Sequence, residues 1–206
     1  MALKSGKEID PKHSALLIQD LQNDVVMEGG KFAGGGASDH AKSQNVIANV
    51  AKLAEAARKA GIPVIHIHYL VPPGAAGLRL NAPLFRGVKD ADAVVRGTWG
   101  AAPVPGVEPQ DGDYVVEKTR MNGFYDTNLD ILLRGLDADT IIVSGAWTNI
   151  SIEHTARHGA DAGYEVVVVS DGTSTINDEW QKAGLEYALN NVGDVATVDE
   201  VIAAIR

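Results

Sequence analysis

The chain of 206 residues contains no cysteine. Disulfide bonds and zinc sites built from thiolates are therefore excluded. A thiol nucleophile is excluded as well, and no other common side chain combines partial ionisation near neutral pH with comparable nucleophilic strength. Any covalent catalysis by this chain must use a different group.

An excess of positive charge and long hydrophobic runs are also missing. The formal net charge is −9, and the lysines and arginines form no cluster of the kind that binds nucleic acid. Residues 1–14 contain no apolar signal segment, and apolar runs such as residues 166–169 are far too short to span a membrane. We therefore expect a cytoplasmic protein with no nucleic-acid partner and no membrane partner.

Apolar segments of strand length alternate with helix-length segments along the chain. Hydrophobic residues make up 45 % of the sequence, enough for a sizeable core, and we expect one domain over residues 1–206. The alternation predicts an α/β fold, a three-layer αβα sandwich with a central, mostly parallel sheet. The expected strands are residues 15–20, 62–69, 113–118, 140–145, 164–171 and 194–198.

Two of the connecting segments have features of their own. The helix after the first strand is expected to be capped by Ser38 or Asp39 and to end at Gly61. Residues 70–112 hold most of the prolines, which predicts a long excursion over the site rather than a second domain. The excursion is more apolar than a solvent loop, so we also expect it to contact another subunit; among its apolar residues are Leu78, Leu80, Leu84, Phe85 and Trp99.

Charged residues stand at the ends of two expected strands. Asp20 ends one apolar run and Lys118 ends another. Ligands of open parallel sheets bind beyond the carboxyl ends of the strands, where a paired Asp and Lys would be poised for proton transfer. The alternative is that Asp20 caps a turn and Lys118 is a solvated strand end.

A serine, Ser151, follows the fourth expected strand in the first turn of a helix. Serine at this place usually serves as a cap. The functional interpretation is that backbone N–H groups at the start of the helix stabilise an anionic nucleophile or a developing oxyanion.

These segments together resemble the isochorismatase-like cysteine hydrolase superfamily, over nearly the whole chain. The segments are "ALLIQDLQNDVV", "VVEKTRMNGFYDTNLDILLR" and "IIVSGAWTNISIEHTARHGADAGYEVVVVSDGTST", in the order of the family motifs. The resemblance implies that Asp20 is the catalytic acid/base and Lys118 the catalytic lysine. Ser151 occupies the position of the nucleophilic Cys. It also implies a homo-oligomer, a dimer or tetramer, and a cis peptide before Trp147.

The resemblance extends to the residues around this triad. The N–H groups of Trp147 and Ser151 would form the oxyanion hole. The lysine segment, with its Lys-x-Arg spacing, is similar to ureido and N-carbamoyl amidohydrolases of the family, in which the arginine would pair with a substrate carboxylate; a surface ion pair is the alternative for that arginine. Tyr69 and Tyr125 are additional aromatic candidates, and the expected substrate-binding residues are Gln22, Asn23, His68, Trp99, Arg120, Phe124 and Trp147.

Serine at the nucleophile position leaves three explanations open. The native chain has Cys and Ser151 is an inactivating replacement, the enzyme uses Ser151 with Lys118 as the base, or the chemistry needs no nucleophile. The third applies to isochorismatases, the enol-ether hydrolases of the family, which would use Asp20 alone. The segments "WTN" and "EHTAR" are closer to the amidohydrolase branch, so we expect hydrolysis of C–N bonds in a small amide or ureido/N-carbamoyl substrate. A non-catalytic binding protein is the remaining alternative.

No cofactor is expected, and no metal site. His66 and His68 share one face of a strand, as two metal ligands would, but the sequence offers no third ligand beside them. One of the two is expected near the substrate at the end of the sheet, and the other under a helix.

Overall fold

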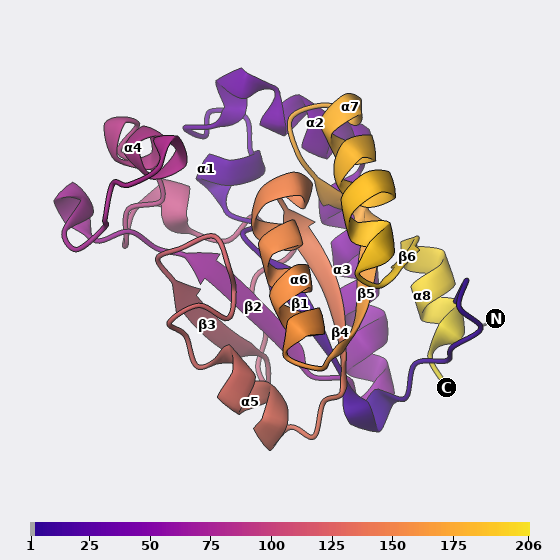
Figure 1. The fold of residues 1–206 in the computed structure, drawn as a ribbon. Coiled ribbons are helices and arrows are strands. Elements are labelled where there is room, and N and C mark those ends of the chain that lie inside the picture. The colour runs from indigo at the N-terminus through magenta and orange to yellow at the C-terminus, as the bar shows by residue number, and fades with distance from the viewer. Residues whose placement is uncertain (1–2) are drawn as a thin grey trace.

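The computed structural model describes residues 3–206. Its centre is a six-stranded sheet in the order β3-β2-β1-β4-β5-β6 (Figure 1). All five neighbouring pairs are parallel, so the predicted central sheet is confirmed. The strands are β1 (Ser14–Gln19), β2 (Val64–Tyr69), β3 (Tyr114–Lys118), β4 (Thr140–Ala146), β5 (Glu165–Ser174) and β6 (Asp194–Ala196).

Helices cover both faces of the sheet, as expected for an αβα sandwich (Figure 1). One face packs against α3 and α8, and the other against α5 and α6. The α-helices are α1 (Asn23–Val26), α2 (Ala37–Ser43), α3 (Val46–Ala60), α4 (Pro83–Asp90), α5 (Leu129–Gly135), α6 (Glu153–Asp161), α7 (Asp178–Lys182) and α8 (Val198–Ala204). Short 3₁₀ and π-helical turns, η1 to η7, connect them; η5 (Thr148–Ile152) is the turn between β4 and α6.

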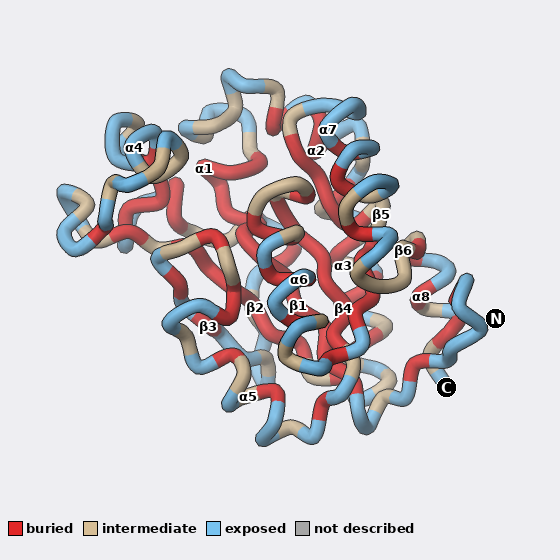
Figure 2. Tube along the Cα trace, in the orientation of Figure 1, coloured by how far each residue is buried: buried red, intermediate tan, exposed pale blue. Residues whose placement is uncertain are grey.

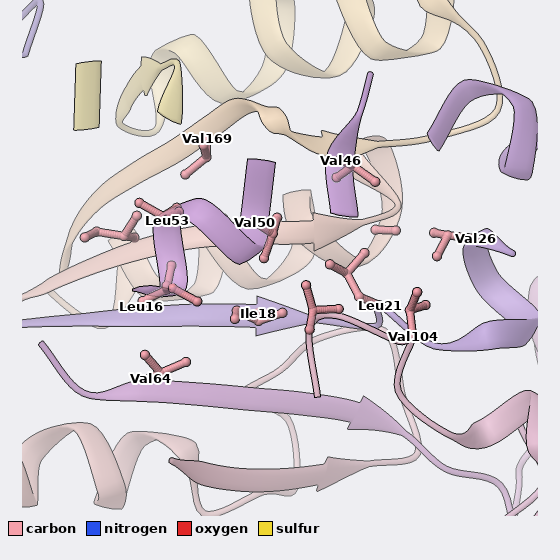
Figure 3. Packing of buried hydrophobic residues seen from close by; sticks show 14 of the residues in the cluster. Leu16, Ile18, Leu21, Val26, Val46, Val50, Leu53, Val64, Val104 and Val169 are labelled. Atoms are coloured by element: carbon pink, nitrogen blue, oxygen red, sulfur yellow. The ribbon is translucent and has the colours of Figure 1, made fainter. Parts of the chain in front are cut away.

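Strand β1 shows why its segment is apolar throughout. Successive side chains of a strand point to opposite faces, and here both faces are covered. Leu16 and Ile18 pack towards α3, where Leu53 and Val50 meet them (Figure 3), and Leu17 belongs to the cluster on the other face. The whole strand is buried, as the red centre of Figure 2 shows.

Several predicted boundaries are wrong, and two of these differences have a clear physical reason. Ser38 and Asp39 do not cap the long helix, because they lie inside a separate helix, α2, and α3 begins only at Val46. Asn45 separates the two helices with a left-handed backbone conformation (φ 52°), which asparagine tolerates better than most residues. The last strand ends at Ala196 rather than at residue 198, because Thr197 caps α8 with a capping box.

Residues 70–112 contain the helix α4 and run beside α1 rather than forming a second sheet. Leu78 is buried, and Leu80, Leu84 and Phe85 pack partly against the core of the same chain. Trp99 is 56 % exposed. The apolar surface that suggested a subunit contact is therefore largely covered within the chain itself, with Trp99 as the exception. Across residues 3–206, no helix combines the length and the apolar character needed to cross a membrane.

Gly145 lies near the end of β4, shortly before the η5 turn, at a point where the backbone of the neighbouring strand β1 comes very close. Its backbone has φ +123°, and a Cβ atom at this position would lie 1.9 Å from the carbonyl oxygen of Gln19 in β1. The register between β4 and β5 shifts at the same place. Only glycine fits here, because any side chain would collide with the backbone of the neighbouring strand.

We expect Gly145→Ala to lower the free energy of unfolding by at least about 3 kcal/mol, from strain plus overlap. The control is Gly87→Ala in α4, where an added methyl group meets nothing within 4 Å. This control should raise stability by about 0.5–1 kcal/mol, the usual gain of Ala over Gly in a helix. Urea unfolding of both variants measures the difference, and equal stabilities would contradict the close contact at Gly145.

Two histidines lie side by side on β2. His66 is buried, and its Nε2 lies 3.0 Å from Oδ2 of Asp113, which also accepts a hydrogen bond from Arg58. His68 is 9 % exposed, with its ring centroid 6.1 Å from that of His66. Burial, with a smaller contribution from the charge of His66, lowers the pKa of His68 from 6.5 to about 4, while Glu117 opposes the shift. His68 is therefore neutral in the folded protein near neutral pH.

This depressed pKa predicts acid sensitivity. The folded state takes up a proton at His68 only near pH 4, whereas the unfolded chain does so near pH 6.5, so stability falls as the pH drops below 6.5. Between pH 7.5 and 5, the native chain should lose about 2 kcal/mol more than His68→Gln, which has no proton to bind at this position. Denaturant unfolding at a series of pH values tests this, and identical pH slopes would refute it.

Candidate active site

The candidate site lies at the carboxyl edge of the sheet, where Asp20, Lys118 and Ser151 come together. Asp20 directly follows β1, Lys118 is the last residue of β3, and Ser151 belongs to the η5 turn that follows β4. The three strands are not all neighbours, because β2 lies between β1 and β3. The long lysine side chain spans the intervening strand.

Asp20 and Lys118 form a buried ion pair. Nζ of Lys118 lies 2.8 Å from Oδ2 of Asp20, and both side chains are shielded from solvent. The ammonium also donates to the backbone oxygen of Arg120 at 2.9 Å and lies 4.8 Å from the ring centroid of Tyr69. The backbone of Asp20 is left-handed (φ 56°), a conformation that Asp adopts more readily than most residues.

Burial shifts the pKa values of the pair in opposite directions. It raises the pKa of the Asp20 carboxyl above its ordinary value, while the charge of Lys118 and hydrogen bonds from Lys118 and Ser151 act the other way. It lowers the pKa of the Lys118 ammonium, and the charge of Asp20 opposes this. The proton affinities of the two groups are thereby brought closer together, which suits Asp20 to exchange a proton with a bound molecule.

Ser151 is held by the turn that follows β4. The peptide bond between Ala146 and Trp147 is cis, and the Trp147 carbonyl accepts hydrogen bonds from the backbone N–H groups of Ile150 and Ile152. Ser151 is 3 % exposed, and its hydroxyl lies 3.5 Å from Sδ of Met121. The hydroxyl is also close enough to the Asp20 carboxylate to lower its pKa.

A small cavity of about 50 Å³ lies between Asp20 and Ser151, which both line it. That volume is room for a few non-hydrogen atoms. Its polar lining comes from Asp20, Tyr69 and Ser151, and the rest of the lining is apolar: Val25, Phe32, Leu84, Val88, Met121, Ala146, Trp147 and Ile150. Leu84 and Val88 belong to α4 of the 70–112 excursion, so this segment forms one wall.

Trp147 lines the cavity and is fixed by two contacts. Its indole Nε1 donates to the Val25 carbonyl at 3.3 Å, and the ring of Phe32 stands edge-on to it at 5.8 Å between centroids. Both partners come from the segment after β1. The segment that begins with Asp20 therefore also positions the aromatic wall beside Ser151.

An outer pocket of about 470 Å³ adjoins the cavity, and Met121 lines both. Arg120 lies here, with its guanidinium 4.2 Å from the ring centroid of Phe85 and Nη1 donating to the carbonyl oxygen of Arg79 at 3.0 Å. Arg79 also lines this pocket, and none of the described lining residues is acidic. Two arginines in a pocket that no acidic side chain lines are unusual in a chain of net charge −9. Their positive charge favours the binding of an anion in this pocket.

Three of the predicted substrate-binding residues lie outside the cavity lining: Gln22 and Asn23, which hold backbone instead, and Trp99. The Gln22 side chain donates to the carbonyl oxygens of Tyr69 (2.9 Å) and Ala101 (2.8 Å), and its oxygen accepts from Tyr69 N–H at 2.8 Å. Asn23 donates to the Trp99 carbonyl at 2.8 Å. Gln22 and Asn23 thus fasten the end of β2 and the 99–101 turn, and the Trp99 side chain points into solvent.

The two other predicted contacts also lie elsewhere. Phe124 is buried, stacks on His158 at 4.8 Å between ring centroids, and packs against Tyr164. His68 lies beside His66 and does not line the cavity. Within residues 3–206, no group of three or more His, Asp and Glu side chains is placed to hold a metal ion.

Sequence reasoning did not identify Gln19 and Met121. The Gln19 amide is fully buried and donates to the backbone oxygens of both Met121 and Ser151, each at 3.1 Å, while its oxygen accepts from Thr155. A signal existed, because Gln19 is an amide in an otherwise apolar strand. Met121 lies in an irregular segment, where no periodic pattern reveals which side chains face a cavity.

Curated relatives cover nearly the whole chain. It is 33 % identical to a ureidoacrylate amidohydrolase, RutB, of Enterobacter sp. (strain 638) over 212 residues, which span 95 % of this chain and 90 % of the relative. It is 30 % identical to the uncharacterised isochorismatase family protein YwoC of Bacillus subtilis over 204 residues, 96 % of this chain and 97 % of that protein.

Solved structures show the same fold. A cysteine hydrolase from Pseudomonas syringae pv. phaseolicola superposes with a TM-score of 0.83 at 26 % identity and covers 99 % of this chain and 96 % of its own. N-carbamoylsarcosine amidase from Thermoplasma acidophilum has a TM-score of 0.72 at 26 % identity, with 91 % and 98 % covered. The Isochorismatase domain profile matches residues 14–200. The chain therefore belongs to the isochorismatase family, and it is a hydrolase of the amidohydrolase type.

Proposed function

We propose that this hydrolase cleaves a C–N bond in a small amide or ureido/N-carbamoyl compound, with Asp20, Lys118 and Ser151 as its catalytic residues. The observation that carries the proposal is the buried ion pair of Asp20 and Lys118, 2.8 Å long, whose Asp20 lines one small cavity together with Ser151. The names of two similar proteins, a ureidoacrylate amidohydrolase and an N-carbamoylsarcosine amidase, support this substrate class.

The proposed reaction uses these groups in turn. Asp20 takes the proton of the nucleophile at residue 151, and the nucleophile attacks the carbonyl carbon of the substrate. The N–H groups of Trp147 and Ser151 hold the oxyanion, and Lys118 keeps Asp20 ionised. Asp20 then protonates the leaving nitrogen and activates water to hydrolyse the acyl-enzyme.

Serine at position 151 slows the first of these steps. A thiol is partly ionised near neutral pH and is intrinsically strongly nucleophilic, whereas a serine hydroxyl is far harder to deprotonate. The shape of the site is nearly the same with either residue. The Ser151 form should therefore bind substrate and turn it over slowly.

Arg120 extends the proposed site outward. It lines the pocket beyond Met121 together with Arg79, and a guanidinium pairs well with a carboxylate. A substrate whose amide or ureido group enters the inner cavity can place an anionic group between these arginines.

We also propose that the protein acts in the cytoplasm as a homo-oligomer. The exposed Trp99 is the apolar residue of the excursion that is available for a subunit contact.

One observation favours a second function, the cleavage of an enol ether by Asp20 alone. The nucleophile position carries no thiol, and the cavity is mostly apolar with Trp147 at its wall. An isochorismatase needs a proton donor rather than a nucleophile. The raised pKa of Asp20 is compatible with that role.

Ser151→Cys separates the two functions. For the amidohydrolase, kcat should rise at least about a hundredfold, the low end of what one catalytic group contributes. Ammonia release is measured with N-carbamoylglycine and other small ureido and amide compounds, and isochorismate cleavage is measured in parallel. Asp20→Ala in either background should abolish activity, which provides the negative control. Unchanged ammonia release together with isochorismate cleavage in both forms would establish the enol-ether function instead.

A further inference from the structure

Tyr69 is the third polar residue of the cavity lining, after Asp20 and Ser151, and the proposed reaction gives it no task. Its place is tightly determined. Gln22 holds both its backbone N–H and its carbonyl oxygen, and its Cα is paired with that of Lys118 between β2 and β3. The Lys118 ammonium lies 4.8 Å from its ring centroid. The ring therefore packs beside the ion pair of Asp20 and Lys118.

The Tyr69 hydroxyl is buried and has no hydrogen-bond partner among the described residues. The residue is 3 % exposed. A buried hydroxyl without a partner destabilises the folded state, and phenylalanine at the same position would avoid this cost. In contrast, the hydroxyl of Tyr164 donates to Asp130 at 2.9 Å. Tyr69 belongs to the cavity lining, so a molecule that enters the cavity can supply the missing acceptor.

The hydroxyl keeps its proton at neutral pH. Burial and, after it, the negative charge of Asp20 raise the pKa of Tyr69 well above its ordinary value of 10. Tyr69 is therefore available as a neutral donor, and its partner must be an acceptor atom.

The order of the strands indicates which acceptor this is. The proposed oxyanion N–H groups follow β4, Asp20 follows β1, and Tyr69 ends β2, so β1 lies between the other two. The oxygen of the reacting carbonyl is directed towards the β4 side. The acceptor for Tyr69 is consequently a different atom, on the β2 side of the substrate.

We propose that Tyr69 is a positioning residue whose hydroxyl donates a hydrogen bond to a second acceptor atom of the substrate, beyond the reacting carbonyl oxygen. The inference rests on the proposed function and makes its substrate class narrower. The substrate is an amide or ureido compound that carries a further oxygen or nitrogen acceptor close to the scissile bond. A simple alkyl amide lacks this atom.

The test is Tyr69→Phe in the Ser151→Cys background. With N-carbamoylglycine, which has acceptor oxygens besides the reacting carbonyl, kcat/KM should fall about tenfold, mainly through KM. With propionamide, which has none, it should change less than about twofold. The melting temperature should stay equal or rise, because the substitution removes an unsatisfied buried hydroxyl. Equal losses with both substrates, or a melting temperature that falls, would overturn the proposal.

Tyr164→Phe provides the matched control. It removes a hydroxyl whose partner is Asp130, away from the cavity lining, so the melting temperature should fall while both kcat/KM values stay the same. A failure of the proposed function would look different. In that case Ser151→Cys releases no ammonia from either compound, and the same Tyr69→Phe comparison is made with isochorismate. A raised KM together with a melting temperature that does not fall would support Tyr69 as a positioning residue for isochorismate. Any other result would contradict a positioning role for Tyr69.

Discussion

The buried ion pair between Asp20 and Lys118 is the interaction on which the rest of the site depends. Two charges are taken out of water, and such a pair is worth little for stability compared with apolar side chains of similar size. Its retention is therefore better explained by chemistry than by folding. Removing either partner would leave the other charge buried and uncompensated, so the two residues function as a unit.

Gln19, at the end of β1, and Gln22, three residues later, both hold backbone near this pair. Gln19 ties the backbone around Met121 to that around Ser151, and Gln22 ties the end of β2 to the 99–101 turn. Each side-chain amide makes several hydrogen bonds to backbone from distant parts of the chain. The segment that carries Asp20, the proposed acid/base residue, thus also organises the strands and loops around it.

The sequence was sufficient for the sheet and for the charged strand ends, because strands buried on both faces must be apolar and a charge at their end is conspicuous. Asp20 and Lys118 are recognisable in this way. The break at Asn45 was not predictable, because a left-handed residue between two helices leaves little trace in a hydrophobic pattern. The role of Gln22 and Asn23 in holding backbone was also not predictable, because the sequence does not tell whether a buried amide side chain faces a ligand or distant backbone.

Met121 forms part of the wall between a cavity of about 50 Å³ and a pocket of about 470 Å³, with its sulfur against the Ser151 hydroxyl. An unbranched thioether turns about three bonds and adapts to different neighbours. The boundary between the two compartments therefore depends in part on a single deformable side chain. Such a wall would let substrates of unequal length reach the proposed catalytic pair through rotation of one side chain, without the rebuilding of a loop.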